Sequence, residues 1–121
     1  MRDLVKAFKA LSDETRLRIL NLLLERECCV CEVMQALSIS QTRASRNLSS
    51  LHDAGFLKLR KAGLWSLYSI DMEGMQEYFS DLVQALSKAL DNNEVLALDR
   101  ERLKKAERVG PGCIRQVRKT V

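Results

Sequence analysis

The sequence predicts a mainly α-helical fold with one small β-hairpin. Along most of its 121 residues, apolar side chains recur every three or four positions, as they do on one face of a helix. Only the stretch from Phe56 to Ile70 changes to an alternation with a period of two, which is typical of strands. Hydrophobic residues make up 46% of the chain and aromatic residues 5%, so we expect one modest core of mostly aliphatic side chains.

Two helices are predicted in the first 25 residues. The first contains apolar residues at helical spacing, namely Leu4, Val5, Phe8 and Leu11. Ser12 and Asp13 then interrupt the pattern, and both side chains are suited to capping the helix that follows. This second helix, from Thr15 to about Leu24, is apolar on most of its faces, so we expect it to be central and heavily buried.

Two further helices are predicted on either side of a short polar break at residues 38–40 (SIS). The helix before the break carries one apolar face, made by Val30, Val33, Met34 and Leu37. The helix after it covers QTRASRNLSSLHDAG, and its inward residues are Ala44, Leu48 and Leu51. Gly55 is a natural C-terminal cap for this helix.

A short basic hairpin is predicted next. The strands run from Phe56 to Lys61 and from Trp65 to Ile70, and Ala62-Gly63 supplies the turn between them. The basic residues near its tip are Lys58, Arg60 and Lys61.

The remainder of the chain is predicted to be helical up to a basic tail. A long helix follows Asp71, with a narrow apolar seam suited to pairing with another helix: Met75, Phe79, Leu82, Leu86 and Leu90. A polar break at residues 91–93 precedes a charged helix from Glu94 to about Arg108. We therefore divide the chain into residues 1–92, containing the core fold and its dimerisation helix, and residues 93–121, containing the C-terminal helix and tail.

The order helix, turn, helix, basic hairpin is that of a winged helix-turn-helix, in which the second helix enters the DNA major groove. The outward face of that helix offers hydrogen-bonding groups for base edges or phosphates: Gln41, Thr42, Arg43, Ser45, Arg46 and Asn47. Lys58, Arg60 and Lys61 are expected to contact phosphates or the adjacent minor groove. A polar helix face alone is typical of a solvated surface, but in combination with the turn, the hairpin and a net charge of +4 it favours binding to double-stranded DNA.

Three segments together resemble the ArsR/SmtB family of arsenical- and metal-responsive repressors: KALSDETRLRIL, QTRASRNLSSLHDAGFL and RKAGLWSLYSI. The resemblance covers about residues 4 to 90. It implies a homodimer held by the first and the long C-terminal helices, bound to an inverted-repeat operator upstream of resistance genes. Gln41, Thr42, Ser45 and Arg46 match the family's recognition-helix positions, whereas Asn47 stands where members often have His.

Three of the four cysteines, Cys28, Cys29 and Cys31, lie within four residues. The charged N-terminus does not resemble an export signal and no apolar run is long enough to span a membrane, so we expect a cytoplasmic protein. In a reducing cytosol, clustered thiols favour a soft-metal or redox site over a disulfide framework.

The segment ECCVCEVM resembles the family's metalloid-binding box, and this resemblance implies As(III) or Sb(III) as the inducer, without an organic cofactor or substrate. Cys29 and Cys31 match the family's cysteine pair, but Met34 stands where the third cysteine is usual. A thioether cannot become a thiolate, so a third sulfur ligand has to come from Cys28 or from Cys113 in the tail of either subunit. We expect Cys28 to be the third ligand, because it is already close to the pair in the chain.

The spacing of Cys29 and Cys31 suggests how an ion affects DNA binding. Residues two apart point to nearly opposite sides of a helix but to the same side of an extended chain. The two sulfurs can therefore hold one ion only if the first helical turn is unwound or has not yet begun. We expect a bound metalloid to alter this helix start and so to disturb the neighbouring DNA-reading helix.

Three other interpretations stay open from the residues alone. A redox or persulfide sensor would oxidise Cys29 with Cys31, or Cys31 with Cys113, instead of chelating an ion. A structural zinc site would need all four cysteines, and a protein-interaction module would not need DNA. An enzyme is not expected, because the chain has one His, no glycine-rich phosphate loop and no nucleophile–base pair.

Overall fold

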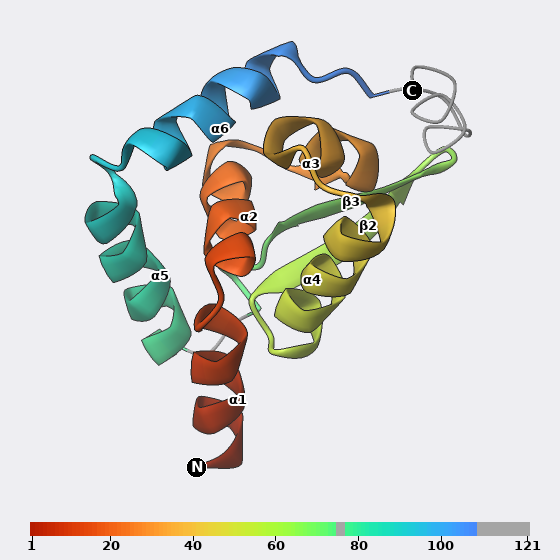
Figure 1. Cartoon of the computed structure of the whole chain (residues 1–121). Helices are drawn as coiled ribbons and strands as arrows, with labels where there is room; N and C mark the ends of the chain where they lie inside the picture. The colour runs from red at the N-terminus through yellow and green to blue at the C-terminus, as the bar shows by residue number, and fades with distance from the viewer. Residues whose placement is uncertain (75–76, 109–121) are drawn as a thin grey trace.

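The computed structural model describes residues 1–74 and 77–108, which form a helical fold with a small sheet (Figure 1). The helices are α1 (Arg2–Leu11), α2 (Glu14–Glu25), α3 (Val30–Leu37), α4 (Gln41–Asp53), α5 (Glu77–Leu90) and α6 (Glu94–Lys105), and the strands are β1 (Cys28–Cys29), β2 (Leu57–Ala62) and β3 (Trp65–Ile70). The prediction of a mainly α fold with a small hairpin is confirmed. The winged helix-turn-helix consists of α3, α4 and the β2–β3 hairpin, which we call the wing (Leu57–Ile70).

The hairpin prediction missed one strand. β1 pairs antiparallel with β3, which gives a three-stranded sheet in the order β1-β3-β2. Cys29 lies opposite Leu67 on β3, and Leu67 lies opposite Arg60 on β2. A strand of two residues is too short to display an alternating pattern, so periodicity cannot reveal it.

Of the predicted caps and turns, those at Asp13, Gly55 and the hairpin loop are confirmed. Ser12 does not cap α2, because its hydroxyl donates to the carbonyl of Lys9 at the end of α1. The Asp13 side chain caps α2 by accepting a hydrogen bond of 3.1 Å from the backbone N–H of Arg16. Gly55 follows α4 with a φ of +97°, a conformation that suits glycine at the end of a helix. Gly63, with a φ of +63°, begins a two-residue loop between the paired residues Ala62 and Trp65, as expected for a type II′ hairpin.

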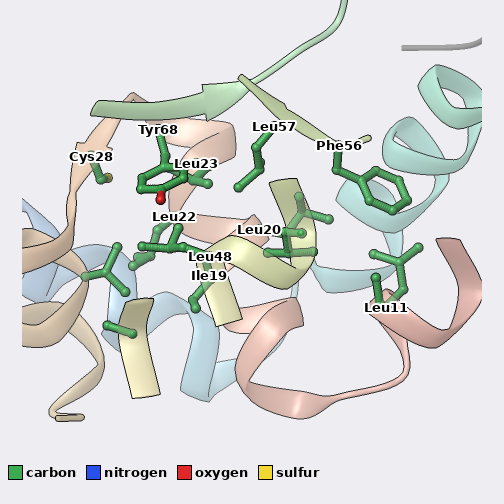
Figure 2. Close-up of a cluster of buried hydrophobic side chains, with 14 of the residues drawn as sticks. Leu11, Ile19, Leu20, Leu22, Leu23, Cys28, Leu48, Phe56, Leu57 and Tyr68 are labelled. Carbon is green, nitrogen blue, oxygen red and sulfur yellow. The ribbon is translucent and has the colours of Figure 1, made fainter. Parts of the chain in front are cut away.

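The core forms around α2, as its apolar composition predicts. Ile19, Leu20 and Leu22 are completely buried. Figure 2 shows these side chains packed against residues from α1, α4 and the sheet, including Leu11, Leu48 and Leu57. Burial of such aliphatic side chains contributes about 1.5–3 kcal/mol each, so this cluster is the main source of stability.

The predicted seam on α5 is only partly exposed. Phe79 and Val83 are buried in the core, while Leu82 and Leu86 are half-buried against it. Met75, the first residue of the predicted seam, lies outside the described residues. In contrast, α1 leaves apolar side chains at the surface: Leu4, Val5 and Phe8 are 38%, 44% and 53% exposed.

Helix α6 folds back across α2 and α3 (Figure 1). Both oxygens of the buried Asp99 carboxylate accept hydrogen bonds of 2.8 Å from the Arg18 guanidinium of α2. The Asn21 side chain donates to the backbone carbonyl of Leu96 and accepts from Arg100. These polar contacts join segments about 80 residues apart, and no local sequence pattern predicts them. The helix ends at Lys105, three residues before the predicted limit near Arg108.

Candidate thiol site and DNA-binding face

Cys29 and Cys31 form a buried thiol pair at the N-terminus of α3. Their Sγ atoms are 2.7 Å apart, and both residues are free cysteines. Cys29 is the N-cap of α3 in extended conformation, with φ −87° and ψ 169°, whereas Cys31 belongs to the first helical turn. The two sulfurs therefore converge because the helix begins at Val30, between them.

This geometry meets one of the two conditions stated from the sequence, namely that the helix has not yet begun at the first cysteine. Cys29 precedes the helix, so the two cysteines approach each other without an unwound turn. The Cys29 side chain also takes part in a capping box, facing the backbone N–H of Glu32 while the Glu32 carboxylate accepts from the Cys29 N–H at 2.9 Å.

A buried carboxylate fixes the segment around the thiols. Glu32 is only 3% exposed and accepts charge-assisted hydrogen bonds from Arg26 at 2.6 Å and from Arg108 at 3.1 Å. Gln35 adds two hydrogen bonds to the backbone of Glu107. Burial alone would raise the pKa of the Glu32 carboxyl, but the Cys29 N–H and the two arginines lower it below its ordinary value. The chain after α6 is thus anchored beside the thiol pair.

Cys28 points away from this pair. It is completely buried in the main core, where Figure 2 shows it near Tyr68 and Leu22. Side chains alternate along a strand, so Cys28 and Cys29 occupy opposite faces of the sheet. Met34 is also in the main core, and Cys113 lies outside the described residues. Within residues 1–74 and 77–108, no group of three or more His, Cys, Asp or Glu side chains is arranged as a metal site.

The thiols of Cys28 and Cys29 differ in pKa because they lie in different environments. Burial, together with the charge of Glu32, raises the pKa of the Cys28 thiol to about 12. A hydrogen bond with Cys31 lowers the pKa of the Cys29 thiol, and the backbone N–H of Glu32 acts in the same direction. The thiolate, which is the metal ligand and the nucleophile, is therefore favoured at Cys29 and disfavoured at Cys28.

This difference predicts selective alkylation. In the folded protein at pH 8, a thiol with a pKa of about 12 is ionised at about one part in ten thousand, so we expect iodoacetamide to modify Cys28 at least roughly a hundredfold more slowly than Cys29. Peptide mass spectrometry over a time course measures both rates. Unfolding in guanidinium is the control and should make the rates equal, whereas equal rates in the folded protein would contradict the assignment.

A second apolar cluster lies over the thiol pair. Cys29, Cys31 and Leu67 are buried together, and the half-buried Ala62 and Trp65 pack against them. The last three residues belong to the wing. The thiols are therefore enclosed between the start of α3 and the wing, on the face of the sheet opposite the main core.

Helix α4, the recognition helix, places part of the predicted DNA-reading set at the surface. Thr42, Arg43 and Arg46 are exposed. Gln41 donates to Ser45 at 2.8 Å, one turn along the helix. The Ser40 hydroxyl caps the helix by accepting a hydrogen bond of 3.1 Å from the Arg43 N–H.

Arg43 and Asn47 contact α2 instead of extending freely from the surface. The Arg43 guanidinium donates to the Thr15 hydroxyl at 2.9 Å. Asn47 accepts from Arg16 at 3.1 Å and donates to the carbonyl of Arg43. In this conformation both side chains hold the recognition helix against α2.

The wing cations differ in their surroundings. Lys58 is exposed, whereas Lys61 donates to Ser66 at 2.6 Å. Arg60 forms a bidentate ion pair with Glu27, in which the Arg60 Nε lies 2.9 Å from a Glu27 carboxylate oxygen. Glu27 precedes Cys29 by two positions in the chain. This hydrogen bonding lowers the pKa of Glu27 and raises that of Arg60.

None of the helices in the described part of the chain combines the length and apolar character needed to cross a bilayer.

A family model described as "Bacterial regulatory protein, arsR family" matches residues 13–59, which span α2, α3, α4 and the first residues of β2.

Curated relatives share this region and more. A "Cadmium resistance transcriptional regulatory protein CadC homolog" of Staphylococcus aureus is 43% identical over 76 residues, which are 62% of this chain and 63%, less than two thirds, of that relative. "Arsenic resistance transcriptional regulator ArsR2" of Pseudomonas putida is 40% identical over 98 residues, covering 80% of this chain and 83% of the relative. The "Arsenical resistance operon repressor" of Escherichia coli is 46% identical over 67 residues, covering 54% of this chain and 57% of the relative.

Solved structures with the same architecture include the "transcriptional repressor BigR" from Xylella fastidiosa, with a TM-score of 0.63 at 26% identity over 77% of this chain and 88% of that one. The "homodimeric winged helix-turn-helix DNA-binding domain" of Mb0332 from Mycobacterium bovis has a TM-score of 0.63 at 28% identity, covering 77% of this chain and 82% of the other.

Proposed function

This chain belongs to the ArsR family of bacterial regulatory proteins, and we propose that it is a cytoplasmic repressor that leaves its operator when As(III) or Sb(III) binds Cys29 and Cys31. It is a winged helix-turn-helix transcriptional regulator and not an enzyme. The relatives named for arsenic and cadmium resistance support a thiophilic inducer.

The observation that carries this proposal is the 2.7 Å approach of the two sulfurs at the first turn of the helix-turn-helix. Thiolates are the ligands that soft ions select, and the lowered pKa of the Cys29 thiol favours the thiolate. Because Cys29 is also the N-cap residue of α3, an ion held by its sulfur acts directly on the first turn of that helix. This connects ligand capture to the helix that supports α4.

Operator binding rests on α4 and the wing of a homodimer. The exposed residues of α4 supply groups for base edges, and Lys58 supplies a phosphate contact. The exposed apolar side chains of α1, Leu4, Val5 and Phe8, support a dimer contact formed by α1 together with α5. The structural neighbour Mb0332 is described as homodimeric, which supports a homodimer here.

The third thiolate is best supplied by Cys113. Cys28 faces the main core, and its pKa of about 12 opposes ionisation. Arg108 is bound to Glu32 beside the thiols, and Cys113 follows it by five positions in the sequence. Five residues span at most about 17 Å when extended, so a sulfur at position 113 lies within reach of the pair.

Operator binding titrated with As(III), Sb(III), Cd(II) and Zn(II) under reducing conditions tests the proposal. We expect As(III) or Sb(III) to weaken operator binding by roughly 5- to 150-fold, the usual range of allosteric coupling. Linkage requires operator DNA to weaken metalloid binding by the same factor. Equal metalloid affinities with and without operator would overturn the proposal.

The same thiol contact favours a second candidate, a redox- or persulfide-responsive repressor. Two sulfurs at 2.7 Å are close enough to be joined by an oxidant that removes both protons and two electrons. Operator release by polysulfide or peroxide, together with no response to As(III) in the presence of reductant, would select this function.

The ion pair between Glu27 and Arg60 predicts that Glu27→Gln strengthens operator binding. The Arg60 guanidinium can form a bidentate contact with a phosphate only after its ion pair with Glu27 is broken. We expect Glu27→Gln to bind the operator several-fold more tightly, with a salt dependence steeper by about one counterion per protomer, measured by fluorescence anisotropy at several salt concentrations.

Glu25→Gln is the matched control for Glu27→Gln, because it removes an exposed charge from the same region without freeing Arg60. Adding Arg60→Gln to the Glu27→Gln variant should abolish the gain. An equal gain from Glu25→Gln would show that only the net charge matters.

A further inference from the structure

The three-stranded sheet has a second face that the main core does not use. Residues directly opposite each other on paired strands share a face, so Cys29, Leu67 and Arg60 lie side by side in one row across the sheet. Ala62 and Trp65, the next pair toward the wing tip, are on the same face and pack against the thiols. The sulfur atoms and a basic wing residue are thus connected by one short row of contacts.

An ion bound by the two sulfurs adds atoms to a cluster that is already filled. Cys29, Cys31 and Leu67 are buried together, and Ala62 and Trp65 pack against them. Protein interiors are close-packed, so the added ion must displace side chains that cover the thiols.

The elements around the thiols differ in how firmly they are held. The start of α3 is fixed by the buried Glu32, with its hydrogen bonds to Arg26, Arg108 and the Cys29 N–H. On the other side, the wing extends past the helices (Figure 1), and a charged contact between it and the cysteine segment is the pair of Glu27 and Arg60, whose side chains are 31% and 57% exposed. Exposed ion pairs contribute little to stability, so the wing yields more readily than α3.

We propose that the wing carries the signal from the thiol pair to DNA, and that Trp65 is the positioning residue through which a captured ion displaces it. This inference rests on the proposed function and adds a second route to the one through α3 and α4. Displacement of the Trp65 and Leu67 side chains shifts the β3 backbone, and with it the row that contains Arg60. The wing cations then lose their alignment with the phosphates while the recognition helix keeps its fold.

The test compares operator affinity with and without As(III) in wild type, Trp65→Ala and Trp65→Phe, and measures As(III) binding to each free protein. Wild type should lose operator affinity by tens of fold. In Trp65→Ala the loss should fall to about threefold or less, while As(III) still binds the free protein as tightly as in wild type or more tightly. Trp65→Phe retains a ring over the sulfurs and should keep most of the coupling. Leu59→Ala, on the other face of the same hairpin, is the matched control and should behave as wild type.

The outcomes distinguish a failure of the proposed function from a failure of the wing inference. A wild-type protein that As(III) does not release refutes the proposed function and this inference with it. Release of Trp65→Ala by the same factor as wild type refutes this inference alone. Amide hydrogen exchange in wild type gives a second readout that does not need a variant: As(III) should accelerate exchange at Ser66, Leu67 and Tyr68, and unchanged protection there would also overturn the proposal.

Discussion

Cys29→Ser and Cys31→Ser are expected to bind the operator nearly as tightly as wild type but to be insensitive to As(III). Serine is a favourable N-cap, so Cys29→Ser keeps the capping box with Glu32 and the start of α3. A hydroxyl is a poor ligand for soft ions, so each variant keeps only one of the two sulfur ligands that the pair supplies to As(III). The ratio of operator affinities without and with As(III) should fall from tens to about one.

Fluorescence anisotropy with labelled operator measures this ratio for all variants in the same buffer. Cys28→Ala is the matched control, because it removes a neighbouring sulfur that faces the main core, and we expect it to respond as wild type does. Cys113→Ser separates the third ligand from the pair: an intermediate response is expected if three thiolates hold the ion. Loss of operator binding in Cys29→Ser would instead assign the pair a role in folding.

The helices and the hairpin were predictable because each is long enough for its period to appear. The helix-turn-helix needs only the apolar spacing of α3 and α4, the polar break between them and Gly55 after α4. β1 was not predictable in this way, since two residues contain one step of alternation. Its existence nevertheless decides the site, because it is the strand that separates Cys28 from Cys29.

The thiol site was predictable in composition but not in geometry. The sequence placed Cys28 with the pair because it is adjacent in the chain. In an extended strand, adjacent side chains point to opposite faces of the sheet. Because Cys28 and Cys29 form β1, Cys28 faces away from the thiol pair. Likewise Arg60, predicted to contact DNA, is paired with Glu27. This pairing is possible because β1 and β2 are the two strands that flank β3, and Glu27 directly precedes β1. Such cross-strand neighbours have no signature in the local sequence.

Asp99→Asn is expected to have the largest effect on stability. The Asp99 carboxylate is completely buried and receives two hydrogen bonds of 2.8 Å from Arg18. The neutral amide loses the charge and one of these acceptors, which leaves the guanidinium without a full partner. Breaking buried pairs typically costs 3–5 kcal/mol, and because Arg18 retains some contact with water we expect about 2–4 kcal/mol. Thermal unfolding followed by circular dichroism should show a Tm lower by roughly 10–20 °C.

The surface pair of Glu101 and Lys104 on the same helix provides the control, because both side chains are more than half exposed. Glu101→Gln removes the same charge from α6 and should change the stability by no more than about 0.5 kcal/mol. A Tm shift that is equally small in Asp99→Asn would mean that α6 is held mainly by the apolar burial of Leu96 and Leu103 and by the hydrogen bonds of Asn21. A large shift in Asp99→Asn but not in Glu101→Gln identifies the Arg18 pair as the contact that keeps α6, and the Arg108 anchor beyond it, against the helix-turn-helix.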